Sequence, residues 1–125
     1  MSDRPLSPHL QIYKIQVTGF FSMVHRLTGI LLFLLLVVLS WYFILHIYFP
    51  ALLVVEYLEV LLSTFIAKLA YVLCFMSFLY HFLNGIRHLL WDAGFNLEIA
   101  DVSKSAMLLA VTLLFSTIAF LFVLI

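Results

Sequence analysis

Three long stretches of this 125-residue chain carry almost no charge, and they limit its possible folds more than any other feature. Residues 30–45 and 106–125 contain no Asp, Glu, Lys or Arg, and residues 61–83 contain only Lys68. About 20 helical residues cross a hydrocarbon layer of about 30 Å, where only helices and closed barrels pair every backbone polar group. The runs lack the alternation of barrel strands, so they predict three membrane-spanning helices. The expected spans are residues 22–48, 61–90 and 104–125.

The overall composition agrees with a membrane protein, since 66% of the residues are hydrophobic and only 10% are charged. A soluble domain averages about 45–50% apolar and about 25% charged residues, and needs the latter to cover its surface. We therefore expect an all-α integral membrane protein with a single domain over residues 1–125, of which residues 1–21 precede the first span. The formal net charge of +0 gives no reason to expect nucleic acid. Cys74 is the single cysteine, which excludes an intrachain disulfide and covalent haem attachment.

The basic residues are divided unevenly between the two ends of the expected spans. Five lie at the end that holds the N-terminus and the second connector, whereas Lys68 is alone at the other end. The five are Arg4, Lys14, Arg26, Arg87 and Lys104. Because basic residues favour the inner side of a membrane, the N-terminus is expected in the cytoplasm or the mitochondrial matrix. The first residues resemble neither a secretory signal nor a mitochondrial presequence, so we expect a bacterial chain, an organelle-encoded chain or a mature form. The expected location is a bacterial or mitochondrial inner membrane.

The stretch YHFLNGIRHLLWD, residues 80–92, places an unusual group of polar side chains within the second span. At helical spacing, small and polar residues share one stripe, which should face other helices or a cofactor rather than lipid. The stripe consists of Cys74, Ser77, His81, Asn84, Gly85, His88 and Asp92. His81 lies about 10.5 Å deeper than His88, so it is a candidate metal ligand or else a hydrogen-bond partner of a neighbouring helix. Gly85 leaves room for a flat macrocycle or a second helix, and Arg87 and His88 suit acidic groups such as haem propionates.

A second polar stripe occurs in FSMVHRLTG, at the start of the first span. Its members Ser22, His25, Arg26 and Gly29 are spaced i, i+3, i+4 and i+7. Arg26 near a helix N-terminus opposes the helix dipole, which indicates a ligand or a partner. Ser22 and Arg26 together can donate hydrogen bonds to a carbonyl such as that of a quinone. Alternatively, Ser22 is only an N-cap and Arg26 only reaches toward lipid phosphates.

Four other ionisable residues receive structural interpretations. His46, at the far end of the first span, is interpreted as an interfacial side chain, and Glu56 and Glu59 as parts of a solvated connector. His9, between Pro8 and Leu10, is interpreted as a surface or subunit contact.

Three stretches in a fixed order carry a resemblance to a known family. RPLSPHLQIY (residues 4–13), SMVHRLTG (residues 22–29) and HFLNGIRHLLWD (residues 81–92) together resemble the cytochrome b membrane-anchor subunit of succinate dehydrogenase, respiratory complex II. The resemblance is to the larger of the two anchor subunits, and the three-span pattern extends it over the full length. The first stretch most resembles the alphaproteobacterial and mitochondrial branch.

The resemblance implies roles for the residues of both stripes. His81 matches an axial ligand of haem b, whose second axial histidine comes from the smaller anchor subunit, and Ser22 and Arg26 match residues of the ubiquinone site. His25 and His88 match positions near the haem propionates. Asp92, which matches an acidic residue near the quinone end, can help to supply protons.

The same resemblance implies a role within a larger enzyme. The expected partners are the smaller anchor subunit, with which this chain forms a larger helical bundle, an iron–sulfur subunit and a flavoprotein subunit. This chain would have no complete active site, and would help to transfer electrons from the iron–sulfur subunit to ubiquinone. The alternatives are a haem b and quinone anchor of a fumarate reductase or another membrane dehydrogenase, and an assembly anchor in which haem is dispensable.

Overall fold

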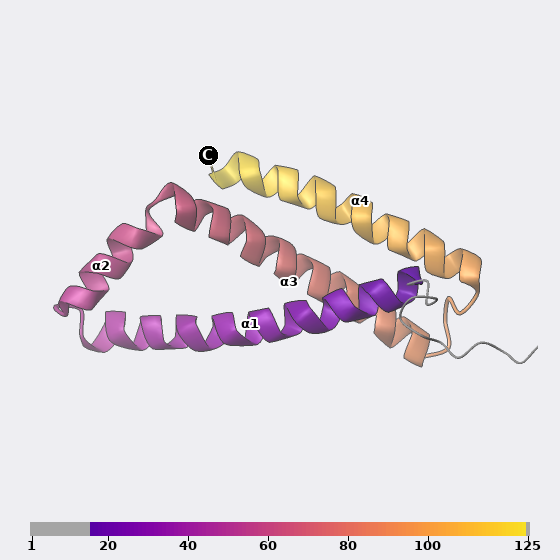
Figure 1. Ribbon diagram of the computed structural model, residues 1–125, viewed down its shortest axis with the longest axis horizontal. Helices are drawn as coiled ribbons and strands as arrows, with labels where there is room; N and C mark the ends of the chain where they lie inside the picture. Colours follow the sequence, from indigo (N-terminus) through magenta and orange to yellow (C-terminus); the bar gives the residue numbers. More distant parts are fainter. Residues whose placement is uncertain (1–15, 125) are drawn as a thin grey trace, which may run out of the picture.

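The computed structural model describes residues 16–124, which fold into α-helices joined by short turns (Figure 1). The helices are α1 (Val17–Tyr48), α2 (Leu53–Leu62), α3 (Phe65–Asp92) and α4 (Ile99–Leu124). Of these, α1, α3 and α4 are long and apolar enough to cross a membrane. The prediction of an all-α protein with three membrane-spanning helices is therefore confirmed. The stretch RPLSPHLQIY, with Arg4 and His9, lies outside the described residues.

The first long helix begins earlier than the sequence suggested. Gln16 has extended backbone angles, and α1 starts at Val17 without a side-chain cap. Ser22 therefore lies in the second turn and is not an N-cap. Arg26 lies in the third turn, where the field of the helix N-terminus has already decayed, so it does not oppose the helix dipole as supposed.

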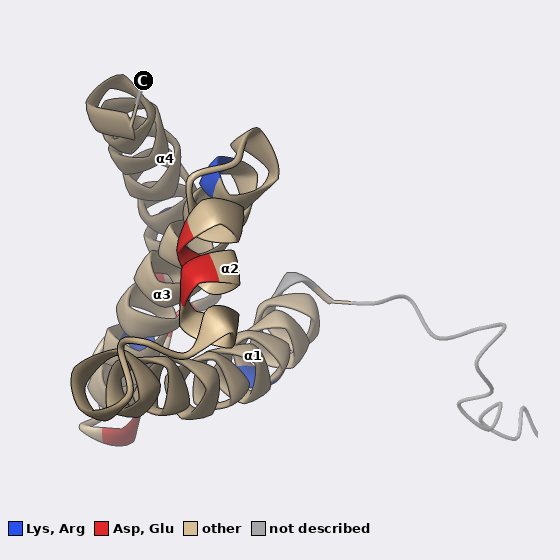
Figure 2. Cartoon of the chain, turned by 90° about the vertical axis from the view of Figure 1, so that its left-hand side faces the viewer, with Lys and Arg blue, Asp and Glu red and all other residues tan. Residues whose placement is uncertain are grey.

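The connector between the first two spans contains a further helix, α2, which the sequence analysis did not predict. Its two acidic residues lie one turn apart, and Figure 2 shows them as neighbouring red turns on one side of α2. Glu59 is half-exposed, and one of its carboxylate oxygens lies 3.1 Å from Nδ1 of His46. The interpretation of the two acids as parts of a solvated connector is thus incomplete, because Glu59 also links α2 to the end of α1.

The central helix is α3, which packs against α1 on one side and α4 on the other. Thr64 caps its N-terminus by accepting a hydrogen bond from the Ala67 amide at 3.3 Å, so α3 begins after a turn rather than at residue 61. In Figure 1, α1 and α3 cross near the start of α1 and diverge toward α2. The start of α1, the end of α3 and the start of α4 consequently lie at the same end of the molecule (Figure 1).

A glycine-containing turn ends α3 and directs the chain into α4. Gly94 has φ +84°, a left-handed conformation that costs glycine little. Its amide donates to the Trp91 carbonyl at 2.9 Å, and the Phe95 amide donates to the Leu90 carbonyl at 2.9 Å. These two bonds form the Schellman pattern, which satisfies the last carbonyls of a helix.

Most large apolar side chains of the long helices remain exposed, as on Leu27 at 66% and Phe33 at 64%. In a bilayer, lipid tails solvate such side chains as well as a protein interior does, so exposure there is not costly. The few contacts between helices are correspondingly specific. The rings of Phe75 and Phe120 stack at 4.3 Å between α3 and α4, and the Tyr80 hydroxyl on α3 donates to the Phe21 carbonyl of α1 at 2.7 Å.

Candidate functional site

Three histidines meet where α1 and α3 cross. The ring of His25, on α1, stacks on that of His81, on α3, with centroids 4.0 Å apart and planes 5° from parallel. The ring of His88, two turns further along α3, lies 5.3 Å from that of His25. Members of the two predicted polar stripes therefore meet across the interface between α1 and α3.

A hydrogen bond to α1 fixes the orientation and the tautomer of the His81 ring. Its Nδ1 lies 3.1 Å from the carbonyl oxygen of His25. Because a carbonyl oxygen can only accept, Nδ1 carries the proton and Nε2 keeps a free lone pair. Histidines that bind metals are commonly held in this way, with one ring nitrogen donating to a carbonyl and the other directed at the metal.

Thr28 is a site residue that the sequence analysis missed. Its hydroxyl oxygen lies 3.3 Å from Nδ1 of His81, and its one hydrogen is within reach of the carbonyls of Val24 and His25, at 3.0 and 2.9 Å. The threonine thus supports both the imidazole and the carbonyl that orients it. The sequence signal for this role was the position of Thr28 in SMVHRLTG, three residues after His25. A threonine at that position is equally typical of a helix in which the hydroxyl bonds only to the backbone of its own helix.

Gly29 allows the His81 ring to approach α1 closely. A Cβ atom at Gly29 would lie 2.9 Å from Cε1 of His81, well inside van der Waals contact. At Gly85, by contrast, a Cβ atom would lie 3.6 Å from Cε1 of His25, which is an ordinary contact. The sequence suggested that space is needed at Gly85, whereas the close approach within this chain is at Gly29.

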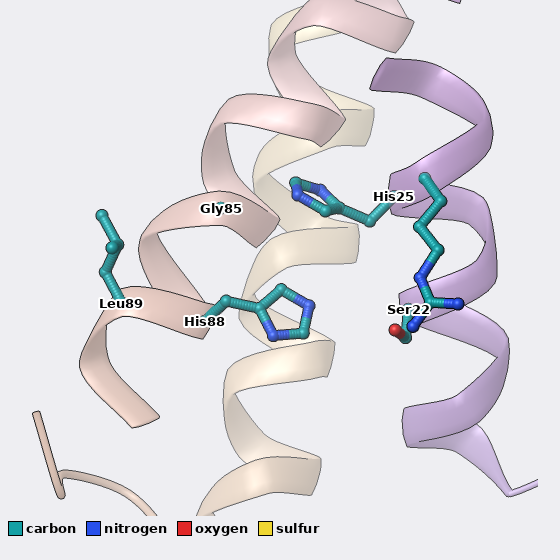
Figure 3. Close-up of a pocket in the computed structure, with 6 residues that line it drawn as sticks. Ser22, His25, Gly85, His88 and Leu89 are labelled. Carbon is teal, nitrogen blue, oxygen red and sulfur yellow. The ribbon is translucent and has the colours of Figure 1, made fainter. Parts of the chain in front are cut away.

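Beside the histidines lies an open pocket of about 510 Å³ (Figure 3). It is lined by Ser22, His25, Arg26, Gly85, His88 and Leu89. Figure 3 shows the rings of His25 and His88 directed toward each other from the two helices, with Leu89 pointing away. The volume falls within the range of about 300–1,000 Å³ that is usual for ligand pockets.

The pocket gathers most of the residues that the sequence singled out. Ser22, His25, Arg26 and His88 line it, and His81 stacks on the ring of His25. Nδ1 of His25 is buried and has no hydrogen-bond partner among the described residues. A buried polar atom without a partner is uncommon, so this nitrogen is available to a bound group. Asp92 is exposed at the end of α3, outside the residues that line the pocket.

Arg87 does not lie where the sequence analysis placed it. Instead of facing the pocket, its guanidinium is directed at α4, where Nε donates to the Ser105 hydroxyl at 3.0 Å and Nη2 to the Val102 carbonyl at 3.1 Å. Nη1 donates to Oδ1 of Asn84 at 2.9 Å. The side chain is only 6% exposed. Three of its five N–H groups are thus bound within the chain, so this geometry gives no support to the hypothesis that Arg87 binds a haem propionate, which stays a prediction.

The described part of the chain supplies no complete metal site. Among residues 16–124, no three His, Cys, Asp or Glu side chains are arranged to hold a metal ion. A metal bound through His81 would therefore take its other ligands from a prosthetic group or from another chain.

Comparison with known proteins gives one consistent family. Residues 1–122 match the model described as succinate dehydrogenase/fumarate reductase transmembrane subunit. The succinate dehydrogenase cytochrome b556 subunit of Rickettsia prowazekii is 42% identical over 102 residues, which cover 82% of this chain and 77% of the relative. The cytochrome b560 subunit of Marchantia polymorpha is 37% identical over 118 residues, covering 86% and 80% of the two chains. That of Porphyra purpurea is 34% identical over 122 residues, covering 98% and 97%.

Proposed function

The chain belongs to the succinate dehydrogenase/fumarate reductase transmembrane subunit family, and we propose that it is the larger membrane anchor of succinate:ubiquinone oxidoreductase. In this role it binds haem b through His81 and helps to bind ubiquinone through Ser22 and Arg26. Membership of the family and the names of the relatives support a membrane cytochrome b subunit of succinate dehydrogenase. The assignments of ligand and substrate are those that the resemblance implies, and the geometry of the site supports them.

The hydrogen bond from Nδ1 of His81 to the His25 carbonyl is the observation that carries the proposal. It leaves Nε2 unprotonated and holds the ring on one side of α1, which is the state that an axial ligand requires. Haem b bound there would supply a one-electron carrier. A histidine of the smaller anchor subunit would supply the other ligand of the iron, an arrangement that suits electron transfer rather than oxygen chemistry.

The surrounding residues fit a haem with its acidic groups toward the end of the molecule where α1 begins. Nδ1 of His25 is buried and has no partner among residues 16–124, and the ring of His88 lies 5.3 Å from that of His25. Two imidazoles at this spacing can donate hydrogen bonds to propionate oxygens. These hydrogen bonds are stronger when the imidazole is charged.

The same pocket offers donors for a quinone. The hydroxyl of Ser22 and the guanidinium of Arg26 both line it, from successive turns of α1. Hydrogen bonds from these groups to a quinone carbonyl strengthen as negative charge develops on the oxygen during reduction. Reduction also consumes protons, and His88 and the exposed Asp92 lie toward the aqueous end of α3, where they can deliver them.

The remaining parts of the proposal concern the assembly. The N-terminal end of α1 faces the cytoplasm or matrix, where the iron–sulfur subunit docks and passes on the electrons that it receives from the flavoprotein subunit. Among residues 16–124, Arg26, Arg87 and Lys104 lie in α1, the end of α3 and the start of α4, whereas Lys68 lies near the start of α3. This distribution supports the orientation through the preference of basic residues for the inner side. The apolar faces left exposed on the long helices suit the smaller anchor subunit and lipid.

An absorption spectrum of the purified complex tests the proposal, with reduction first by succinate and then by dithionite. We expect a b-type Soret and α band that responds to succinate. A complex without a b-type band would contradict haem binding and favour the alternative that the chain is an assembly anchor in which haem is dispensable. A band that responds to dithionite but not to succinate would favour a different dehydrogenase, such as a fumarate reductase, or a haem that lies off the path of electrons.

A further inference from the structure

Arg87 is a buried cation near the end of α3, and it is fixed in one position. It is 6% exposed, and each of its three guanidinium nitrogens donates a hydrogen bond. The acceptors are the Ser105 hydroxyl, the Asn84 amide oxygen and the Val102 carbonyl oxygen, at 2.9–3.1 Å. All three acceptors are uncharged.

No carboxylate compensates this charge within the described residues. Neither of the two ion pairs found among residues 16–124 includes Arg87. Arginine remains protonated in proteins, so the full positive charge stays buried. The faces of Phe21 and Trp91, 5.4 and 4.6 Å from Cζ, stabilise it further through cation–π contact. An ionisable group in a membrane is costly enough that it generally serves a function beyond joining helices.

The charge lies close to the histidine cluster. The ring of Trp91 lies 4.6 Å from Cζ of Arg87 and meets the ring of His88 at a right angle, with centroids 5.0 Å apart. The guanidinium is therefore within about 10 Å of His88, a distance over which a charge that water does not screen still acts strongly. Asn84, the acceptor of Nη1, lies on α3 between His81 and His88 and is fully buried.

We propose that Arg87, held by Asn84, Ser105 and Val102, is a fixed positive charge that raises the reduction potential of the haem bound at His81. The inference rests on the proposed function and adds a residue that does not contact the haem. Reduction of the iron adds one negative charge to the site. A nearby positive charge stabilises the reduced state more than the oxidised state, so it shifts the potential upward.

The sharpest test uses Asn84→Asp, because this substitution changes the charge while preserving the packing. The new carboxylate keeps the oxygen that accepts from Nη1 of Arg87, and the adjacent guanidinium keeps it ionised. The substitution also removes Nδ2 of Asn84, which is buried and has no partner among the described residues. The positive charge is thereby balanced without loss of the link between Arg87 and α3.

The measurement is a spectroscopic redox titration of the haem in the purified whole complex. For Asn84→Asp and Arg87→Gln we expect the ratio of oxidised to reduced haem at a fixed ambient potential to rise about tenfold, equivalent to ~59 mV for a one-electron couple. Arg87→Lys retains the charge, and Ser105→Ala removes one acceptor while leaving the charge in place. Both should keep the wild-type potential, although both weaken the contact between α3 and α4.

The outcomes separate an electrostatic role from a structural one. Unchanged potentials in Asn84→Asp would overturn the proposal, and so would equal shifts in Ser105→Ala and Arg87→Lys, which would indicate a packing effect. If Arg87→Gln does not assemble, the comparison of Asn84→Asp with Ser105→Ala decides alone. A wild-type complex without b-type haem would contradict the proposed function itself, whereas a haem with an unresponsive potential would contradict only this inference.

Discussion

Replacing Gly29 with alanine should displace the His81 ring and weaken haem binding. The added Cβ would lie 2.9 Å from Cε1 of His81, whereas ordinary contacts begin at 3.4 Å, so the ring or α1 must move by about 0.5 Å. The hydrogen bond from Nδ1 to the His25 carbonyl is already 3.1 Å long. A displacement of this size along the bond lengthens it to about 3.6 Å, at which a hydrogen bond is no longer formed.

The expected magnitude follows from the loss of this orientation. Overpacking of a tight contact costs about 1–3 kcal/mol, and loss of a group that orients a ligating histidine lowers metal affinity about 10–100-fold. We therefore expect Gly29→Ala to lower the affinity for haem by about that factor. The haem that remains bound should have an altered low-spin signal, because the plane of one axial imidazole has rotated.

The assay is the haem content per assembled complex, together with the electron paramagnetic resonance spectrum of the oxidised haem. Gly85→Ala is the matched control, since its Cβ would lie 3.6 Å from Cε1 of His25, an ordinary contact. Gly85→Ala should keep most of its haem. Full haem content and an unchanged spectrum in Gly29→Ala, with loss of haem in Gly85→Ala, would refute the role assigned to the two glycines.

Three further substitutions test other parts of the site. Arg26→Ala removes a donor to the quinone, so it should lower succinate–quinone activity about 10-fold or more while dye reduction by the soluble subunits continues. Equal loss of both activities would indicate a disrupted complex. Asp92→Asn should slow quinone reduction with haem content unchanged, and wild-type rates would exclude Asp92 from proton supply. Tyr80→Phe removes the 2.7 Å hydrogen bond to the Phe21 carbonyl and should lower the free energy of unfolding by about 1–3 kcal/mol. An unaltered melting temperature of the complex would show that this bond between α1 and α3 is dispensable.

Helical spacing in the sequence correctly predicted that His81, Gly85 and His88 share a face of α3, but not which neighbour each side chain meets. His25 and His81 are 56 positions apart, and their stacking depends on how α1 and α3 cross. That crossing follows from close packing at Gly29 and from the bond between Tyr80 and the Phe21 carbonyl, neither of which has a local signature in the sequence.

The misplacement of Arg87 has a similar origin. It precedes His88 directly, so spacing alone suggested a shared environment with the pocket. Its acceptors Ser105 and Val102 belong to α4, and a buried guanidinium must turn toward whichever helix can satisfy its donors. Without the position of α4, the sequence could not distinguish these directions.

Some helix ends carry recognisable signals in the sequence and others do not. The end of α3 carries a clear signal in Gly94, with its left-handed backbone, whereas α1 begins at Val17 without any capping side chain. In the same way, α2 escaped prediction because a ten-residue segment is too short to stand out as a membrane span. Its link to α1 depends on Glu59 meeting His46, a contact between segments rather than a local pattern.

The most direct test of the central claim is the absorption spectrum of a complex that carries His81→Ala, compared with one that carries His46→Ala. His46 is a half-exposed histidine beside Glu59 and far along α1 from the site, so it controls for the loss of an imidazole. We expect His81→Ala to lose or alter the b-type bands in a complex that still assembles, and His46→Ala to keep them. Wild-type bands in His81→Ala, with loss of the bands in His46→Ala, would contradict the assignment of His81 as the haem ligand of this chain.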